Sequence, residues 1–259
     1  MATEIQSPSN VTPALPQELH PNVEHLVTED DTPVDNVFSE KQQRLLTEPL
    51  YSSPGWAALD RKYIALANVG LFYAIRQPPY VPDMLLSLDV ELPADLWPKS
   101  HRSYFVWEYG KPPEVVVEVV SNEEGRERTD KLSGYARIGV RYYVIYDPQR
   151  MLHEEPLSGF QLDAMVYRPM AEPLWLPGVD LGLRLWDGRY EDHEGTWLRW
   201  TDATGSPILT GAERAEQEHL RAEQEHVRAE QEHLRAEQER LRADRLAEQL
   251  RSLGATPAE

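Results

Sequence analysis

The chain has 259 residues, of which 41% are hydrophobic, contains no cysteine and carries a formal net charge of −18. This length and composition predict one folded domain with extensions. The lack of cysteine excludes disulfide bonds, thiolate zinc sites and cysteine nucleophiles. The negative charge argues against indiscriminate binding of nucleic acids, because phosphate contacts depend on Lys and Arg, but it is compatible with a local basic surface.

No segment has the character of an export signal or a membrane span. The first residues lack a basic region followed by an apolar core, so we expect no signal peptide. The longest mostly apolar stretch, residues 63–75, contains Asn68 and is too short to cross a bilayer. These features predict a soluble, cytoplasmic protein with no membrane partner.

Residues 1–40 contain eight Asp or Glu residues and no Lys or Arg, and they show no apolar periodicity. Such a segment cannot bury enough apolar surface to offset the entropy lost on ordering. We therefore expect a disordered acidic tail. The alternative, a tail that competes with DNA for a basic surface, has no support in the sequence.

Residues 41–205 contain a strand–helix–strand pattern. Residues 115–120 and 142–146 are apolar, β-branched runs typical of buried strands. Between them, residues 124–138 have apolar side chains at helical spacing, and Gly139 stands where a helix end favours a left-handed residue. Two strands joined by a helix are predicted to be parallel, with a right-handed crossover.

The remaining pattern of this domain indicates further strands. Residues 60–75 have apolar spacing compatible with a helix that passes into a strand. Strands are also predicted at residues 81–90, 161–167, 181–186 and 196–200. The later ones are separated by Gly and Asp, which suggests antiparallel hairpins. The expected class is α/β (α+β), with a mixed sheet and flanking helices.

Residues 206–254 are different in kind, because the heptad RAEQEHL begins at Arg214 and recurs with a period of seven residues. Its last position, occupied by Leu220, Val227, Leu234 and Leu241, forms one helical stripe. With this stripe at heptad position d, Glu occupies g and Arg occupies e, a charge pattern that favours a parallel coiled-coil partner. Position a is Gln, however, so a long single helix with intrahelical ion pairs is an open alternative. The repeated histidines, seven residues apart, are predicted to lie on a solvated face.

Three polar residues suggest chemistry. Glu118 lies inside the apolar run at residues 115–120, where an unpartnered charge is costly, and a metal ion is one suitable partner. Asp83 precedes another apolar run, and Lys131 lies on the helix predicted after Glu118. Two carboxylates can hold a magnesium ion against a phosphate, and a lysine can orient the attacking water or stabilise the transition state.

Each of these residues also has a structural interpretation. A Pro-Asp dipeptide such as that at Asp83 is usually a turn or a cap. A carboxylate in a strand, such as Glu118, more often lies at a sheet edge or pairs with Arg. A helical lysine such as Lys131 is most often solvated. Their joint occurrence in this order favours a metal site.

The order, spacing and type of residues across 45–200 resemble the PD-(D/E)XK nuclease superfamily and, within it, the Uma-type restriction endonuclease family. The segments that carry this resemblance are YVPD at 80–83, EVVVEVVS at 114–121, Lys131, Tyr135, GV at 139–140, YYV at 142–144 and DP at 147–148. The resemblance implies a restriction-endonuclease-like core, DNA as the substrate and Mg²⁺ (or Mn²⁺) as the cofactor. It assigns metal binding to Asp83, Glu118 and Val119, and catalysis to Asp83, Glu118 and Lys131.

The sequence departs from the superfamily pattern in two places. The usual lysine two residues after the second acid is replaced by Val120, and the resemblance assigns its role to Lys131 in the following helix. The early helix of the family is not visible, although Glu48 is a candidate for its acidic residue.

The sequence leaves the roles of several other side chains open. Arg137 and Arg141, at i and i+4, are predicted either to face DNA phosphates or to pair with the acidic residues of the same helix. Six tryptophans and their neighbours are predicted to pack in the core and hairpins, with base stacking as the alternative: Trp97, Trp107, Trp175, Trp186, Trp197 and Trp200.

Together these features predict a magnesium-dependent DNA endonuclease that acts as a homodimer, because two sites related by a two-fold axis suit cleavage of both strands. The alternative is a catalytically inactive scaffold on a nuclease fold, in which Asp83, Glu118 and Lys131 form a buried ion-pair cluster and the C-terminal helix binds partners.

Overall fold

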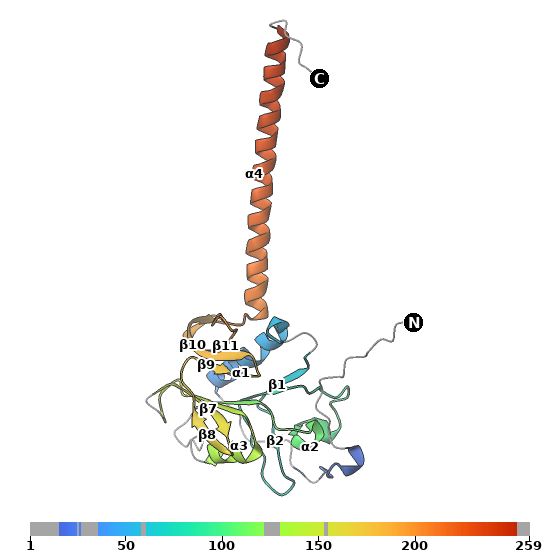
Figure 1. The fold of residues 1–259 in the computed structure, drawn as a ribbon, viewed down its shortest axis with the longest axis vertical. Coiled ribbons are helices and arrows are strands. Elements are labelled where there is room, and N and C mark those ends of the chain that lie inside the picture. The colour runs from blue at the N-terminus through green and yellow to red at the C-terminus, as the bar shows by residue number, and fades with distance from the viewer. Residues whose placement is uncertain are drawn as a thin grey trace. The chain divides into compact units, whose positions relative to one another are not determined.

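The structure is a computed structural model that describes residues 16–24, 26, 36–57, 61–121, 130–152 and 155–252. It divides the chain into two compact units, Met1–Thr210 and Gly211–Glu259 (Figure 1). The first unit combines helices with a multi-stranded mixed sheet, and the second consists of a long helix. The predicted α/β (α+β) class, with a C-terminal long helix, is therefore confirmed.

The central sheet has six strands in the order β1-β3-β5-β6-β7-β8. These strands are β1 (Tyr63–Ala67), β3 (Met84–Leu88), β5 (Val115–Val119), β6 (Tyr142–Tyr146), β7 (Leu157–Asp163) and β8 (Val166–Pro169). The pair β5–β6 is parallel and every other neighbouring pair is antiparallel. The parallel pair flanks α3 (Leu132–Ile138), which confirms the predicted strand–helix–strand unit.

One face of this sheet is covered by α1 (Val37–Ser52) and by a second sheet with the strand order β11-β10-β9 (Figure 1). The strands of the second sheet are β9 (Leu174–Leu176), β10 (Leu181–Tyr190) and β11 (His193–Thr201). Leu46 and Leu50 of α1 pack in the same buried cluster as Trp200 of β11, and the Trp200 indole donates a 2.7 Å hydrogen bond to the Leu46 carbonyl.

The other face is covered by α3, α2 (Val106–Tyr109) and the short parallel pair β2 (Leu71–Phe72) and β4 (Tyr104–Phe105). Because alternate strand residues point to opposite faces, Val115 and Val117 belong to the α1-side cluster, whereas Val116 and Val120 belong to the α3-side cluster. The intervening Glu118 shares the α3 side with Val116 and Val120. Both faces of β5 are thus buried, which explains its nearly continuous apolar sequence.

Two predicted elements differ from the structure. Residues 61–75 contain no helix in the described part, since they form β1, a connection through Asn68 and then β2. The strand predicted at 161–167 is a hairpin, because Ala164 and Met165 take left-handed φ angles of 47° and 68° and reverse the chain between β7 and β8. No glycine or proline marks this turn, so its sequence resembles a continuous strand.

The structure also contains α1, which the sequence patterns did not predict. The helix begins inside the range assigned to the acidic tail, where the Asn36 side chain accepts a hydrogen bond from the Ser39 amide. Upstream, Val23 is buried and packs with Phe72 and Phe105. The domain boundary placed at residue 41 therefore lies inside a helix, and part of the segment before it contacts the folded unit.

The crossover helix ends as expected, because Gly139 has a φ of +93° at the C-terminus of α3. Its predicted first part, residues 124–129, lies outside the described residues.

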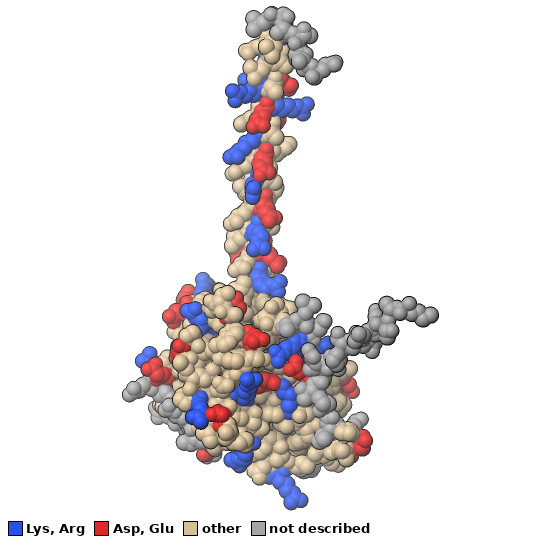
Figure 2. Space-filling model, in the orientation of Figure 1, with Lys and Arg blue, Asp and Glu red and all other residues tan. Residues whose placement is uncertain are grey.

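The second unit contains α4 (Gly211–Ser252), a helix of 42 residues with no buried side chain. Its stripe residues are about half exposed. Figure 2 shows acidic and basic side chains interspersed along the helix, and two i,i+4 ion pairs form, Arg214–Glu218 and Arg228–Glu232. Within the part of the chain that the structure describes, no helix is both long and apolar enough to span a membrane.

Candidate active site

The register between β3 and β5 places two acids side by side. Met84 pairs with Val117 and Leu85 with Val116, so one further step along this antiparallel ladder sets Asp83 opposite Glu118. Residues opposite each other on one face of an antiparallel pair have Cβ atoms about 4.5–5.5 Å apart, and like charges there are destabilising. Two carboxylates in this position require a proton or a cation between them.

The Asp83 carboxylate is held by two hydrogen bonds, one to each oxygen. The Gln43 side-chain amide of α1 donates to Oδ1 at 2.8 Å, and the Val119 main-chain amide donates to Oδ2 at 2.6 Å. The main-chain carbonyl of Asp83 accepts a further bond from the Asn68 amide. Asp83 is only 9% exposed, so its side chain has a defined orientation beside β5.

The Glu118 carboxylate is almost completely buried, with 2% of its surface exposed. The Tyr135 hydroxyl of α3 donates to Oε1 at 2.7 Å, and the Lys131 ammonium lies 2.9 Å from Oε2. Burial raises the pKa of Glu118, while the nearby Lys131 charge and the Tyr135 hydrogen bond act in the opposite direction. The same burial, together with the Glu118 charge, raises the pKa of Tyr135 well above its ordinary value, so this hydroxyl remains a donor.

Lys131 comes directly before α3, and its side chain is 25% exposed. The ammonium therefore touches a buried carboxylate while keeping access to solvent. The parallel crossover explains this placement, because the chain leaves β5 at its carboxyl end and returns over the same end at the start of α3. Ligands collect at this end of strands in open α/β sheets.

The charges in this group do not balance when both acids are ionised, because Asp83 and Glu118 carry two negative charges against one positive charge on Lys131. Across the described residues, no group of three or more His, Cys, Asp or Glu side chains is placed to hold a metal ion. A cage made only of protein side chains is thus not formed by these residues. Magnesium needs fewer protein ligands than such a cage supplies, because it commonly uses one or two carboxylates together with waters and substrate phosphates.

The donors present fit such an ion. Carboxylate oxygens have two lone pairs each, and such oxygens are the ligands that Mg²⁺ prefers. Val119 has an apolar side chain, so only its main-chain carbonyl is a suitable ligand, and its amide already contacts Asp83. The structure thus brings Asp83, Glu118, Val119 and Lys131 together, and their roles in metal binding and catalysis stay a prediction.

Two supporting residues were missed by the sequence analysis. Gln43 is one of several buried polar residues of α1, and nothing in its sequence distinguishes it from its neighbour Gln42. The Tyr135 hydroxyl was missed because the residue was treated as part of an apolar helix face. Glu48, the acid considered for the early helix, is exposed and lies outside the site.

The basic residues of the crossover helix have different surroundings. The Arg141 guanidinium lies 5.3 Å from the centre of the Tyr142 ring. The Arg137 charge acts to lower the pKa of Tyr80, although burial raises it. The ring centres of Tyr80 and Tyr135 are 5.0 Å apart. The acidic residues at 123, 124 and 127, proposed as alternative partners, lie outside the described residues.

The six tryptophans differ in burial, and Trp107, Trp175 and Trp186 are partly buried. Trp197 and Trp200 are buried, as expected for core residues. Trp97 is 80% exposed, so the prediction of core packing is wrong for this residue. The main chain of Trp97 is held by hydrogen bonds to the side chains of Asp95 and Arg102, so the loop keeps its conformation while the indole lies in solvent.

Comparison with known proteins identifies the family of the chain. No curated protein matches the chain. The Uma2 family, described as "Putative restriction endonuclease", matches residues 31–172, a range that includes α1, Asp83, Glu118 and Lys131. The chain belongs to this family, and through it to the PD-(D/E)XK nuclease superfamily.

Proposed function

We propose that the protein is a magnesium-dependent endonuclease that hydrolyses phosphodiester bonds in DNA. The observation that supports this most strongly is the placement of Asp83 opposite Glu118, with Lys131 2.9 Å from the second carboxylate. Membership in a restriction endonuclease family supports the reaction class. Manganese is the expected substitute for magnesium, since carboxylate and carbonyl oxygens suit both ions.

Asp83, Glu118 and the Val119 carbonyl are the groups that would hold the ion. When bound, the ion lowers the pKa of a water molecule and offsets the charge that develops on the phosphate. Gln43 and the Val119 amide orient Asp83, and Tyr135 orients Glu118. Hydrogen bonds of this kind fix the orientation of metal-binding carboxylates.

The Lys131 ammonium has two proposed roles. In the absence of substrate it partly neutralises Glu118. With DNA bound, its partly exposed ammonium can hydrogen-bond the attacking water or a phosphate oxygen, which stabilises charge as it develops. Partial exposure and the flexible four-carbon stem of a lysine suit both roles.

Cleavage of supercoiled DNA, measured with and without Mg²⁺ or Mn²⁺, tests this proposal. We expect metal-dependent nicking that is abolished in Glu118→Gln and reduced about 10²–10³-fold in Lys131→Met, the loss typical of one transition-state donor. Arg168→Met is the matched control. Arg168 is an exposed basic residue of β8 that pairs with Asp163 of β7. Equal nicking by wild type and Glu118→Gln would refute the assignment.

A scaffold without catalysis is the second candidate, because Glu118 already has Lys131 and Tyr135 as partners. Calorimetric titration with Mg²⁺ or Mn²⁺ separates the two functions. Binding that is lost in Glu118→Ala supports the enzyme, whereas no binding at millimolar metal supports the scaffold.

We also propose that α4 forms a parallel homodimeric coiled coil. The half-exposed stripe of α4 and the opposite charges at its e and g positions support this arrangement. Sedimentation of the full chain and of a chain ending at residue 205 tests it, with a dimer expected only for the full chain. A monomer in both cases favours the single-helix alternative.

A further inference from the structure

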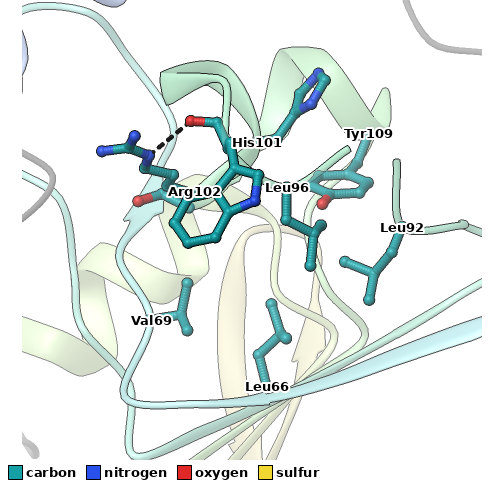
Figure 3. A pocket seen from close by; sticks show the side chains of 9 residues that line it. Leu66, Val69, Leu92, Leu96, His101, Arg102 and Tyr109 are labelled. Atoms are coloured by element: carbon teal, nitrogen blue, oxygen red, sulfur yellow. Dashed lines mark hydrogen bonds between the residues drawn. The ribbon is translucent and has the colours of Figure 1, made fainter. Parts of the chain in front are cut away.

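A cavity of about 570 Å³ lies beside the edge strand β1, outside the group formed by Asp83, Glu118 and Lys131. Its lining comes from β1, the loop that follows it, the segment before η3 (Lys99–His101) and the end of α2 (Figure 3): Leu66, Val69, Leu92, Leu96, Trp97, His101, Arg102, Ser103 and Tyr109. Small-molecule sites typically have volumes of about 300–1,000 Å³. The cavity is thus large enough for a nucleotide-sized ligand.

The outer wall carries large apolar side chains that remain exposed. Leu92, Leu96 and Trp97 are 40%, 50% and 80% exposed, respectively. Three adjacent exposed apolar residues are unusual on a soluble surface and indicate a binding site. The proximity of an indole to a mostly apolar cavity favours a flat, aromatic ligand.

This wall is held in place by hydrogen bonds. The Trp97 amide donates to Asp95 Oδ1 at 3.0 Å, and Arg102 Nε donates to the Trp97 carbonyl at 2.8 Å, the bond drawn in Figure 3. His101 Nδ1 lies 2.6 Å from the Asp95 carbonyl, which only accepts, so Nδ1 is the donor. The wall is therefore formed before a ligand arrives, and ordering it costs little on binding.

The inner wall contains the hydroxyl groups of two largely buried residues, Ser103 and Tyr109. Ser103 and Tyr109 are only 3% and 7% exposed, and both line the cavity. Neither hydroxyl makes a hydrogen bond to any residue that the structure describes. Figure 3 shows the Tyr109 hydroxyl directed toward Leu96. Burial raises the pKa of Tyr109 to about 12, so the hydroxyl keeps its proton.

These hydroxyls decide the chemistry of the ligand. A hydrocarbon in the cavity would remove water from Ser103 and Tyr109 and leave both unsatisfied, which is costly. A heterocycle with ring nitrogens and carbonyl or amino groups stacks on the indole through its face and bonds the hydroxyls through its edge. Arg102 lies at the rim and is suited to a phosphate.

The cavity and the candidate active site share a side of the sheet. Leu66 packs against the α3-side cluster that contains Tyr135, the donor to Glu118. Val69 follows Asn68, whose amide donates to the Asp83 carbonyl at 3.3 Å. The loop that carries Val69 thus connects the cavity lining to the segment of Asp83.

We propose that this cavity binds an unstacked nucleobase of the nucleic-acid substrate. This inference rests on the proposed function, because it assigns the base recognition of the same substrate. An unpaired base offers a π-face to Trp97 and polar edges to Ser103 and Tyr109, and a base that is already unstacked requires the least energy to insert.

The test compares a duplex that contains one extrahelical adenine with the same duplex that carries an abasic residue at that position. Binding is measured in EDTA, so that cleavage does not interfere. We expect the wild type to prefer the extrahelical base, and Trp97→Ala to lose about 5- to 150-fold of that preference, as for removal of one base-stacking side chain. Tyr109→Phe, which keeps the ring stacked on Tyr104, should lose a smaller part of it.

Met165→Ala serves as the control, because Met165 is 60% exposed but lies in the β7–β8 turn at the opposite edge of the sheet. Equal binding of the two duplexes by the wild type, or an unchanged preference in Trp97→Ala, overturns the proposal. Asp83→Asn separates the two proposals, since it should keep the base preference and lose metal-dependent cleavage. Cleavage that persists in Asp83→Asn contradicts the proposed function without affecting the base preference.

Discussion

Gly134 of α3 lies directly beneath the hydroxyl of Tyr80. A Cβ atom built on Gly134 would lie 2.0 Å from Tyr80 Oη and 2.4 Å from Tyr80 Cζ, so no larger residue fits without movement. This contact connects the segment that leads into Asp83 with the helix that carries Tyr135. The segment that leads into Asp83 therefore packs against the helix that carries Tyr135, at a separation that suits glycine at position 134.

Gly134→Ala should consequently destabilise the protein, although Ala is favoured over Gly in a helix by about 1 kcal/mol. Overpacking typically costs about 1–3 kcal/mol, which exceeds that gain. Urea unfolding measures the effect, and the double variant Gly134→Ala, Tyr80→Ala should recover part of the loss. A Gly134→Ala variant more stable than the wild type would show that Tyr80 moves away freely.

Gln43→Ala should weaken metal binding and cleavage about 10- to 100-fold, the usual effect of removing a residue that orients a metal ligand. Its side-chain amide is the donor to Asp83 Oδ1. Gln42 provides the matched control, because its side chain bonds the main chain of Leu198 instead. Gln42→Ala should lower stability and leave the metal affinity unchanged, as measured by calorimetry. Equal loss of metal affinity in both variants would contradict an orienting role for Gln43.

The raised pKa of Glu118 gives a pH-dependent effect on stability. Because the folded state holds this proton at higher pH than the unfolded state, its contribution is complete below the ordinary value of 4.5 and is lost as pH rises through the raised pKa. In EDTA, the free energy of unfolding of the wild type should therefore decline relative to that of Glu118→Gln as pH rises above 4.5.

Unfolding in urea at a series of pH values measures this difference. Millimolar Mg²⁺ should restore stability to the wild type at the upper end of the series and leave Glu118→Gln unaffected, because binding to the folded state stabilises it. Parallel pH curves for the two proteins would show that folding leaves the pKa of Glu118 unchanged.

Leu234→Glu should dissociate the proposed dimer, since it places a charge in the middle of the apolar stripe of α4, where Leu234 is 50% exposed. Ala236→Glu introduces the same side chain two residues later, at heptad position f, away from the seam. Sedimentation at micromolar concentration should give a monomer for Leu234→Glu and a dimer for Ala236→Glu. A dimer that survives Leu234→Glu would place the interface outside the heptad stripe.

Local chemistry made several features predictable. The apolar run of β5, the left-handed Gly139 and the parallel crossover follow from residue type and spacing, and all three are present. Helix α1 could not be recognised in the same way. Three of its buried residues are polar, Ser39, Gln42 and Gln43, and the two glutamines bond distant positions, Leu198 and Asp83.

By itself, the sequence determined the strand–helix–strand unit around Glu118 and the long C-terminal helix, because these patterns depend on neighbours within a few positions. The tertiary structure alone decided that Asp83 lies opposite Glu118, since strand register is set by packing across the whole sheet. It also decided that Trp97 is exposed and that Gln43 reaches Asp83. Contacts between segments far apart in the chain depend on how the layers pack, and no local pattern encodes that arrangement.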